Sequence, residues 1–241
     1  MSAAPMLPVV ILAGGLGTRI RQYGENVPKA LLDINGEPFL AHQLRLLQKN
    51  GIRHVILCIG HLAEQIESFT GDGSRFGLKV EFSYDGPVLL GTAGAIRNAL
   101  PKLHSAFFVL YGDSYLTCDY AAIQKSFLRS RKKALMTVLK NEGRWDKSNV
   151  EFANGKIRVY DKKLNSPAMK HIDYGLGVFQ RSVFEALPTD QKIDLAAVYR
   201  DLLAQGELAA YEVPERFYEI GSPEGLLELR AYLAGRTHEE K

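Results

Sequence analysis

Cysteine, net charge and long apolar runs are all scarce in this sequence. The two cysteines, Cys58 and Cys118, lie beside apolar runs, which favours reduced, buried thiols over disulfides and predicts a cytoplasmic location. A formal net charge of only +3 gives no indication of a nucleic-acid partner. The longest apolar stretches have about six residues, whereas a membrane helix needs roughly 20. No basic residue precedes the apolar N-terminal run, so neither a signal peptide nor membrane association is expected.

The composition is that of an ordinary globular protein. Of the 241 residues, 46% are hydrophobic and 24% are charged, which argues against disorder and against a coiled coil. The length fits one large domain, and no linker or internal repeat divides it. We therefore expect a single domain over residues 1–241.

Three apolar segments, residues 8–13, 55–59 and 107–111, are each followed by a glycine. Such runs are typical of buried parallel strands. Between the first two, residues 38–50 repeat leucines at helical spacing and end at an Asn-Gly pair. This alternation predicts an α/β protein with a Rossmann-like, open, mixed and mostly parallel sheet that has helices on both faces. Ligands should bind at the carboxyl ends of the strands, near Gly14, Gly60 and Gly112.

The second half departs from simple alternation of strand and helix. Asp119 is positioned to cap a helix through Ser130, and residues 133–140 favour a strand. Residues 150–160 alternate around Asn154-Gly155, which predicts a hairpin. Strands are expected at 208–213 and 216–220, followed by a helix from Ser222-Pro223 to about residue 233.

A glycine-rich turn, Gly14-Gly15-Leu16-Gly17-Thr18-Arg19, directly follows the first strand. Its backbone N–H groups can approach a phosphate chain closely, and Arg19 adds positive charge. The turn lacks the Lys-Ser/Thr pair of the common ATPase loop, and Ile20 stands where the dinucleotide fingerprint needs its third glycine. We therefore expect a nucleotide phosphate site and no dehydrogenase.

Residues 12–19, together with Pro28-Lys29, closely resemble the signature of the sugar-1-phosphate nucleotidyltransferases. The resemblance extends over nearly the whole chain, through residues 91–94, 111–113, 161–162, 173–175 and 218–224. It implies the nucleotide-diphospho-sugar transferase fold, with a nucleotide-binding half at about 1–115 and a sugar-phosphate-binding half at about 116–235. It also implies that a nucleoside triphosphate and a sugar 1-phosphate react to an NDP-sugar and pyrophosphate.

The resemblance also implies a role for individual residues. Arg19 would hold the leaving triphosphate portion and Lys29 the attacked phosphate, while Lys162, or its neighbour Lys163, would bind the sugar phosphate. The residues implied to bind nucleotide are Leu12, Ala13, Gly14, Gly15, Gly17, Thr18, Gly91, Thr92 and Asp113. Those implied to bind the sugar phosphate are Asn149, Lys162, Asp173 and Gly175.

Mg²⁺ is the cofactor that the resemblance implies. Asp113 would bind it, with Glu219 as a partner that ligates directly or through a water. The family usually has aspartate at this second position, so the longer side chain is a departure. The six histidines have no zinc spacing with the cysteines.

Residues 89–96 and 107–114 most resemble the D-glycero-α-D-manno-heptose 1-phosphate guanylyltransferases, which supply GDP-heptose for bacterial surface polysaccharide. GTP is then the expected nucleotide. The alternatives are a mannose-1-phosphate guanylyltransferase, a sugar-1-phosphate uridylyltransferase, or a non-catalytic nucleotide-sugar-binding subunit. Because only one helix and a tail are expected after residue 220, the resemblance implies a catalytic core without the β-helix extension of longer relatives. The sequence leaves a homodimer open.

Overall fold

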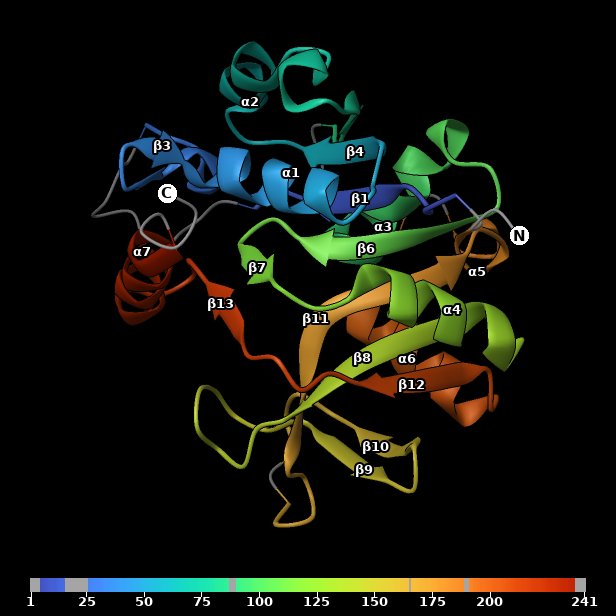
Figure 1. The fold of residues 1–241 in the computed structure, drawn as a ribbon. Helices are drawn as coiled ribbons and strands as arrows, with labels where there is room; N and C mark the ends of the chain where they lie inside the picture. The colour runs from blue at the N-terminus through green and yellow to red at the C-terminus, as the bar shows by residue number, and fades with distance from the viewer. Residues whose placement is uncertain (1–4, 16–25, 87–89, 165, 189–190, 237–241) are drawn as a thin grey trace.

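A computed structural model describes residues 5–15, 26–86, 90–164, 166–188 and 191–236 (Figure 1). Its centre is a nine-stranded mixed sheet in which β10, β9, β11, β6, β1, β4 and β5 are neighbours in that order. β8 pairs with β11 and with β12. The strands of this sheet are β1 (Val9–Leu12), β4 (His54–Ile59), β5 (Lys79–Tyr84), β6 (Ala106–Tyr111), β8 (Ala134–Lys140), β9 (Val150–Ala153), β10 (Lys156–Tyr160), β11 (His171–Gln180) and β12 (Leu208–Glu212).

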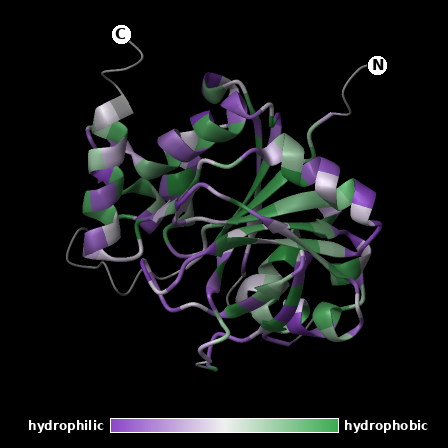
Figure 2. Ribbon diagram, turned by 60° about the horizontal axis from the view of Figure 1, so that its bottom comes forward, coloured by the Kyte–Doolittle hydropathy of each residue, from purple (hydrophilic) through white to green (hydrophobic). Residues whose placement is uncertain are grey.

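The first half of the sheet is parallel and buried on both faces. β1 lies between β4 and β6, and β5 continues the parallel order beyond β4. Val9, Val10 and Ile11 are completely buried, as expected for a strand covered on both sides. Figure 2 shows the hydrophobic colour concentrated in the sheet, while the covering helices carry both colours.

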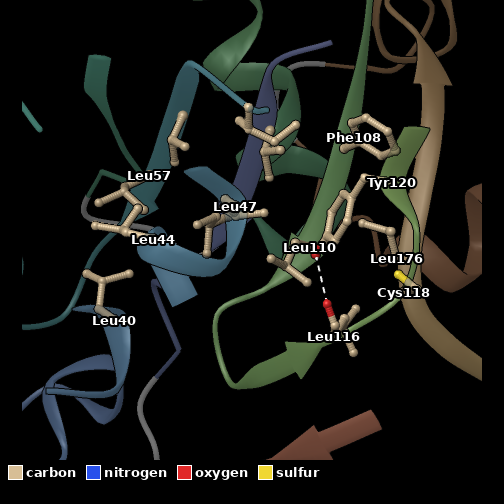
Figure 3. Close-up of a cluster of buried hydrophobic side chains, with 14 of the residues drawn as sticks. Leu40, Leu44, Leu47, Leu57, Phe108, Leu110, Leu116, Cys118, Tyr120 and Leu176 are labelled. Carbon is tan, nitrogen blue, oxygen red and sulfur yellow. Dashed lines mark hydrogen bonds between the residues drawn. The ribbon is translucent and has the colours of Figure 1, made fainter. Parts of the chain in front are cut away.

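Helices cover both faces of the sheet, and they belong to two separate apolar clusters. On one face lie α1 (Phe39–Lys49), α2 (Ala63–Thr70) and α4 (Tyr120–Ser130); on the other lie α3 (Gly91–Ala99), α5 (Ser182–Glu185) and α6 (Leu195–Ala204). Figure 3 shows Leu40, Leu44 and Leu47 of α1 within the first cluster. In the same view the Tyr120 hydroxyl donates to the Leu116 carbonyl at 3.4 Å. The predicted open mixed sheet is therefore confirmed.

β11 pairs with both the parallel and the antiparallel parts of the sheet. It runs antiparallel to β6 along Leu176–Gln180 and antiparallel to β8 along most of its length. Its register with β8 shifts between Asp173 and Gly177, so the strand bends away from β6. Its first residue, His171, pairs with β9. One strand thus contacts the parallel half, β8 and the β9–β10 hairpin.

A small antiparallel pair lies outside the main sheet. β7 (Ser114–Leu116) pairs with β13 (Phe217–Glu219), and α7 (Pro223–Arg236) follows β13 beside it (Figure 1). A third apolar cluster fixes α7 against residues from β2 (Asp33–Ile34), α1 and β7. The remaining short strand, β3 (Glu37–Pro38), pairs with β2. The β7–β13 pairing therefore brings the C-terminal part of the chain close to the end of β6.

Several local predictions are confirmed. The hairpin turns at Asn154-Gly155, where both residues have positive φ. Asp119 caps α4 by accepting a hydrogen bond from the Ala122 N–H at 2.9 Å. Both cysteines are buried and free, and burial raises the pKa of the Cys118 thiol to about 12. Among the described residues, no helix is long and apolar enough to cross a membrane.

Candidate active site

The ends of β1, β4 and β6 meet at one edge of the sheet, as their terminal glycines predict. The Ala13 N–H donates to the Cys58 carbonyl at 2.8 Å, and the Gly112 N–H donates to the Leu12 carbonyl at 3.0 Å. The glycine turn therefore starts between the ends of β4 and β6, with Gly14 and Gly15 leading out of the sheet. The predicted Gly17, Thr18 and Arg19 lie outside the described residues.

Lys29 and Asp113 form an ion pair at this edge. Pro28 precedes a 3-10 turn at Lys29–Leu31, and the buried Ala30 anchors that turn. Lys29 Nζ lies 2.7 Å from Asp113 Oδ2, and the two side chains are 17% and 32% exposed. A cation and a carboxylate thus lie together, partly shielded from water, beside the glycine turn.

Glu219 lies next to this pair because β7 and β13 are paired. Glu219 is opposite Ser114, and the Ile220 N–H donates to the Asp113 carbonyl at 2.9 Å. The Glu219 carboxylate accepts hydrogen bonds from the Gly221 N–H and, at 2.6 Å, from the Ser222 hydroxyl. A Cβ at Gly221 would collide with the Glu219 carboxylate and lie 3.1 Å from Lys29 Nζ. Only glycine leaves room there for the Lys29–Asp113–Glu219 cluster.

The cluster suits a magnesium ion shared with phosphates. No group of three or more His, Cys, Asp or Glu side chains that could hold a metal occurs among the described residues. Mg²⁺ in phosphate-transfer sites, however, commonly takes one or two carboxylates and fills its other positions with water and substrate phosphates. Asp113, in the turn before β7, and Glu219, in β13, supply two carboxylates, and each oxygen that accepts one hydrogen bond keeps another lone pair. The donor set fits the ion.

A second group of predicted residues meets where β11 bends. Asn149 Oδ1 accepts from the Asp173 N–H at 2.9 Å, and Asp173 Oδ1 accepts from the Gly175 N–H at 3.1 Å. The Tyr160 hydroxyl donates to Asp173 Oδ2 at 3.1 Å. Three of the four residues expected to bind the sugar phosphate, Asn149, Asp173 and Gly175, are therefore linked through the Asp173 carboxylate and backbone.

Of the two candidate lysines, Lys162 faces the strand end. Its Nζ lies 5.7 Å from the centre of the Tyr111 ring, directly before Gly112 and Asp113 in the chain. Lys163 is held by its backbone: its N–H donates to Asp161 at 2.7 Å, and its carbonyl accepts from Lys147. Lys162 therefore lies between the Asp173 group and the end of β6, which favours it over Lys163.

Desolvation raises the pKa of Asp173 above its usual range, although the charge of Lys162 and the hydrogen bonds from Gly175 and Tyr160 oppose this. Since folding favours the protonated carboxyl, its stabilising contribution is complete at low pH and is lost as pH rises through the folded-state pKa. Asp173→Asn stays neutral at every pH. The substitution therefore removes the cost of burying a charged carboxylate, and the melting temperature at pH 7 is expected to rise. Each kcal/mol gained in the free energy of unfolding corresponds to about 2–4 °C.

That gain should shrink in thermal melts as the pH falls towards about 4, the ordinary range of an aspartate. Asp161→Asn is the matched control, because backbone N–H groups hold the pKa of this exposed carboxyl below its usual range. Its effect on stability at pH 7 should have the opposite sign. A melting temperature for Asp173→Asn below that of the wild type at pH 7 would contradict the assignment.

Gly91 and Thr92, predicted to contact the nucleotide, begin α3. The Thr92 hydroxyl accepts from the Leu195 N–H at 2.7 Å and lies 3.4 Å from Asp194 Oδ1, at the start of α6. The backbone of Ile193 bonds both to the Leu90 carbonyl and to the Ala93 N–H. Thr92 thus joins the start of α3 to the start of α6, and its contact with nucleotide stays a prediction.

The sequence motifs leave out Asp85, which also lies at this edge. Asp85 directly follows β5. The sequence signal for Asp85 is an acidic residue directly after an alternating strand pattern. Because β5 is a parallel neighbour of β4, its carboxyl end lies at this same edge of the sheet.

A mixed sheet with a glycine turn after its central parallel strand, and a lysine–carboxylate pair at the next strand end, defines an α/β protein of the nucleotide-diphospho-sugar transferase fold. The chain belongs to the nucleotidyl transferase family, whose model matches residues 8–235. This match confirms the family resemblance that residues 12–29 carry.

Its relatives include enzymes with different bases and sugars. A mannose-1-phosphate guanylyltransferase of Mycobacterium tuberculosis is 30% identical over 92% of this chain and 63% of its own length. A D-glycero-α-D-manno-heptose 1-phosphate guanylyltransferase of Campylobacter jejuni is 27% identical over 90% of this chain and 96% of its own length. A UTP–glucose-1-phosphate uridylyltransferase of Synechocystis is 28% identical over 86% of this chain and 58% of its own length. The chain thus spans about three fifths of the first and third relatives.

Among solved structures, HddC from Yersinia pseudotuberculosis superposes with a TM-score of 0.79 at 26% identity. The match covers 95% of this chain and 100% of that one. The same protein has been solved in complex with GMP-PN.

Proposed function

We propose that this protein is a sugar-1-phosphate guanylyltransferase that converts GTP and D-glycero-α-D-manno-heptose 1-phosphate to GDP-heptose and pyrophosphate, for bacterial surface polysaccharide. The observation that carries the proposal is the contact of Lys29 with Asp113 at the end of β6, beside a glycine turn in a chain of the nucleotidyl transferase family. Within this proposal, residues 1–115 bind the nucleotide and residues 116–235 bind the sugar phosphate.

In the proposed reaction, a phosphate oxygen of the sugar 1-phosphate attacks the α-phosphorus of the triphosphate. The bond from the α-phosphorus to the bridging oxygen breaks, and that oxygen leaves with pyrophosphate. Two polyanions must be aligned while negative charge develops on the leaving group, so positioning and electrostatics dominate. No covalent enzyme intermediate is needed.

The chain's own cations divide this task. Lys29 would neutralise the attacked α-phosphate, where a compact ammonium follows moving oxygens, and Arg19 would hold the leaving phosphates with its planar fork. Lys162 would bind the phosphate of the sugar, and Asn149 and Asp173 would orient the sugar hydroxyls. Asp113 and Glu219 would hold Mg²⁺, which supplies further positive charge to the phosphates.

Two similarities support the choice of GTP and heptose. The heptose-specific relative from Campylobacter jejuni aligns over almost its whole length, and HddC has been solved with GMP-PN. The mannose-1-phosphate guanylyltransferases and the uridylyltransferase among the relatives define the competing substrates.

A screen for pyrophosphate release tests the proposal. Four NTPs are crossed with heptose, mannose, glucose and amino-sugar 1-phosphates in Mg²⁺, with EDTA as the control. GTP with the heptose 1-phosphate should give the highest kcat/KM. A higher value for another pair would replace the substrates, and no release with any pair would favour a non-catalytic nucleotide-sugar-binding protein.

Lys162→Ala is expected to raise KM for the sugar 1-phosphate by tenfold or more, because a charge-assisted contact to phosphate contributes about 1.5–3 kcal/mol. KM for the nucleotide should change little. Lys163→Ala removes the same charge one residue away and is expected to leave both constants within about twofold. Steady-state kinetics with each substrate varied in turn measures the difference, and a larger effect of Lys163→Ala would reverse the assignment.

A further inference from the structure

The loop between β8 and β9, residues 141–149, packs against β13 through Trp145, the single tryptophan of the chain (Figure 1). The Trp145 ring meets the Phe217 ring edge to face, with 6.3 Å between the ring centres. The guanidinium carbon of Arg216 lies 5.2 Å from the centre of the Trp145 ring and 4.5 Å from that of Tyr218. Both distances are short enough for a cation to be attracted to an aromatic face. Arg216 therefore joins the loop to the strand.

Arg216 is also tied to α7. Its guanidinium forms an ion pair with the Glu228 carboxylate, and the Tyr218 ring beneath it stacks on Tyr232 of the same helix at 4.2 Å. The Arg216 Nε–H donates to the Phe217 carbonyl at 3.3 Å. A planar guanidinium that is stacked and paired in this way keeps one orientation. Arg216 thus holds the loop, β13 and α7 in a fixed arrangement.

The two segments that meet at Arg216 each end at a residue of the candidate site. The loop ends at Asn149, whose Oδ1 accepts a hydrogen bond from the Asp173 N–H. The buried Asn141 side chain donates to two groups of the same loop, which makes the loop a compact body. β13 ends at Glu219, beside Lys29 and Asp113. A shift of the loop against β13 would therefore change the separation of the two groups of site residues.

We infer that Arg216 is a positioning residue that sets the separation between the sugar-phosphate site and the nucleotide site; this inference rests on the proposed function. The attacking phosphate oxygen must be aligned with the α-phosphorus, and a displacement of about 1 Å can lower the rate about 10²-fold. The contacts described for Arg216 are to Trp145, Phe217, Tyr218 and Glu228. It acts through the segments that it joins, so its loss impairs alignment while the nucleotide still binds.

Arg216→Gln is expected to lower kcat by tenfold or more, measured as pyrophosphate release with the substrate pair that the wild type turns over fastest. This choice makes the test independent of which base and sugar are preferred. The dissociation constant of the nucleotide, measured by calorimetry, should stay within about twofold of the wild type, because uniform binding is untouched. Arg158→Gln, at an exposed position of the β9–β10 hairpin, is the matched control and should keep both wild-type values.

Trp145 supplies a measurement that does not depend on turnover. Because the chain has one tryptophan, tryptophan fluorescence reports on this loop alone. Acrylamide should quench that fluorescence more efficiently in Arg216→Gln than in the wild type, since the ring loses the guanidinium that covers it. Arg158→Gln should be quenched like the wild type.

Two further variants separate stacking from charge. Arg216→Lys keeps the charge but not the plane, so its kcat should lie between those of the wild type and Arg216→Gln. Glu228→Gln removes the ion pair and leaves the stack, and its kcat should stay within about fivefold of the wild type, because partly exposed pairs contribute little. Arg216→Lys carries the test if Arg216→Gln does not fold.

Wild-type kcat in Arg216→Gln, or in Arg216→Lys where that variant carries the test, would overturn the inference alone. A loss of nucleotide affinity as large as the loss of kcat would also overturn it, because the residue would then support binding rather than alignment. Unchanged quenching of Trp145 in Arg216→Gln would show that the stack does not hold the loop. A wild type that releases no pyrophosphate from any substrate pair would overturn the proposed reaction and this inference with it.

Discussion

Lys29→Ala is expected to lower kcat for the favoured substrate pair by about 10²–10³, the effect of removing one preorganised group that stabilises transition-state charge. Lys29 Nζ already lies 2.7 Å from Asp113 at the strand end where the phosphates would meet. Its ammonium is thus in place before substrate binds, and its loss leaves the developing charge without that partner. Pyrophosphate release at saturating substrates measures the effect.

Stability should change far less than turnover. The Lys29–Asp113 pair is partly exposed, and such pairs contribute roughly 0.2–1 kcal/mol, so the melting temperature should fall by no more than about 2–4 °C. Lys156→Ala, at an exposed position that starts β10, is the matched control and should keep wild-type kinetics. Turnover of Lys29→Ala within tenfold of the wild type would refute the role of this lysine.

Asp113→Asn is expected to lower kcat by a similar factor of about 10²–10³ and to raise the Mg²⁺ concentration needed for half-maximal activity. The amide keeps one acceptor oxygen but loses the negative charge that a hard cation prefers. It also leaves Lys29 without its ion-pair partner. Activity titrated with Mg²⁺ separates the two effects, because excess metal should restore part of the rate only if metal binding is weakened.

Asp72→Asn removes a carboxylate from the exposed turn after α2 and should change neither the rate nor the Mg²⁺ requirement. An Asp113→Asn protein with wild-type turnover at ordinary Mg²⁺ concentrations would exclude Asp113 as a ligand. A large loss that Mg²⁺ cannot restore would assign Asp113 to positioning Lys29.

Local patterns predict the first half of the fold well. β1, β4 and β6 are continuous apolar runs that end in glycine, and this is what burial on both faces requires. β11 is harder to predict, because Gly175 and Gly177 interrupt an apolar pattern that is in fact one strand of ten residues. α6 has no strongly polar face within residues 195–199, so its sequence does not distinguish a helix from a buried strand.

The same division holds for the candidate site. The glycine turn and Lys29 are recognised from consecutive residues, and the strand end at Asp113 follows from its apolar run. The approach of Glu219 to Asp113 depends on the β7–β13 pairing, which joins segments about one hundred residues apart. The position of Asp85 beside the glycine turn depends on the order of β1, β4 and β5 and on the space at two glycines. No local sequence pattern predicts either of these.

The position of β11 has a consequence for dissecting the molecule. A chain cut near residue 115 would leave β6 with a bare edge in one fragment and β11 with a bare edge in the other, and such unpaired edges promote aggregation. Each fragment expressed alone is therefore expected to be insoluble, whereas coexpressed fragments can restore the missing ladder and reassemble. Substrate-binding properties are best assigned by point substitution in the intact protein rather than by truncation.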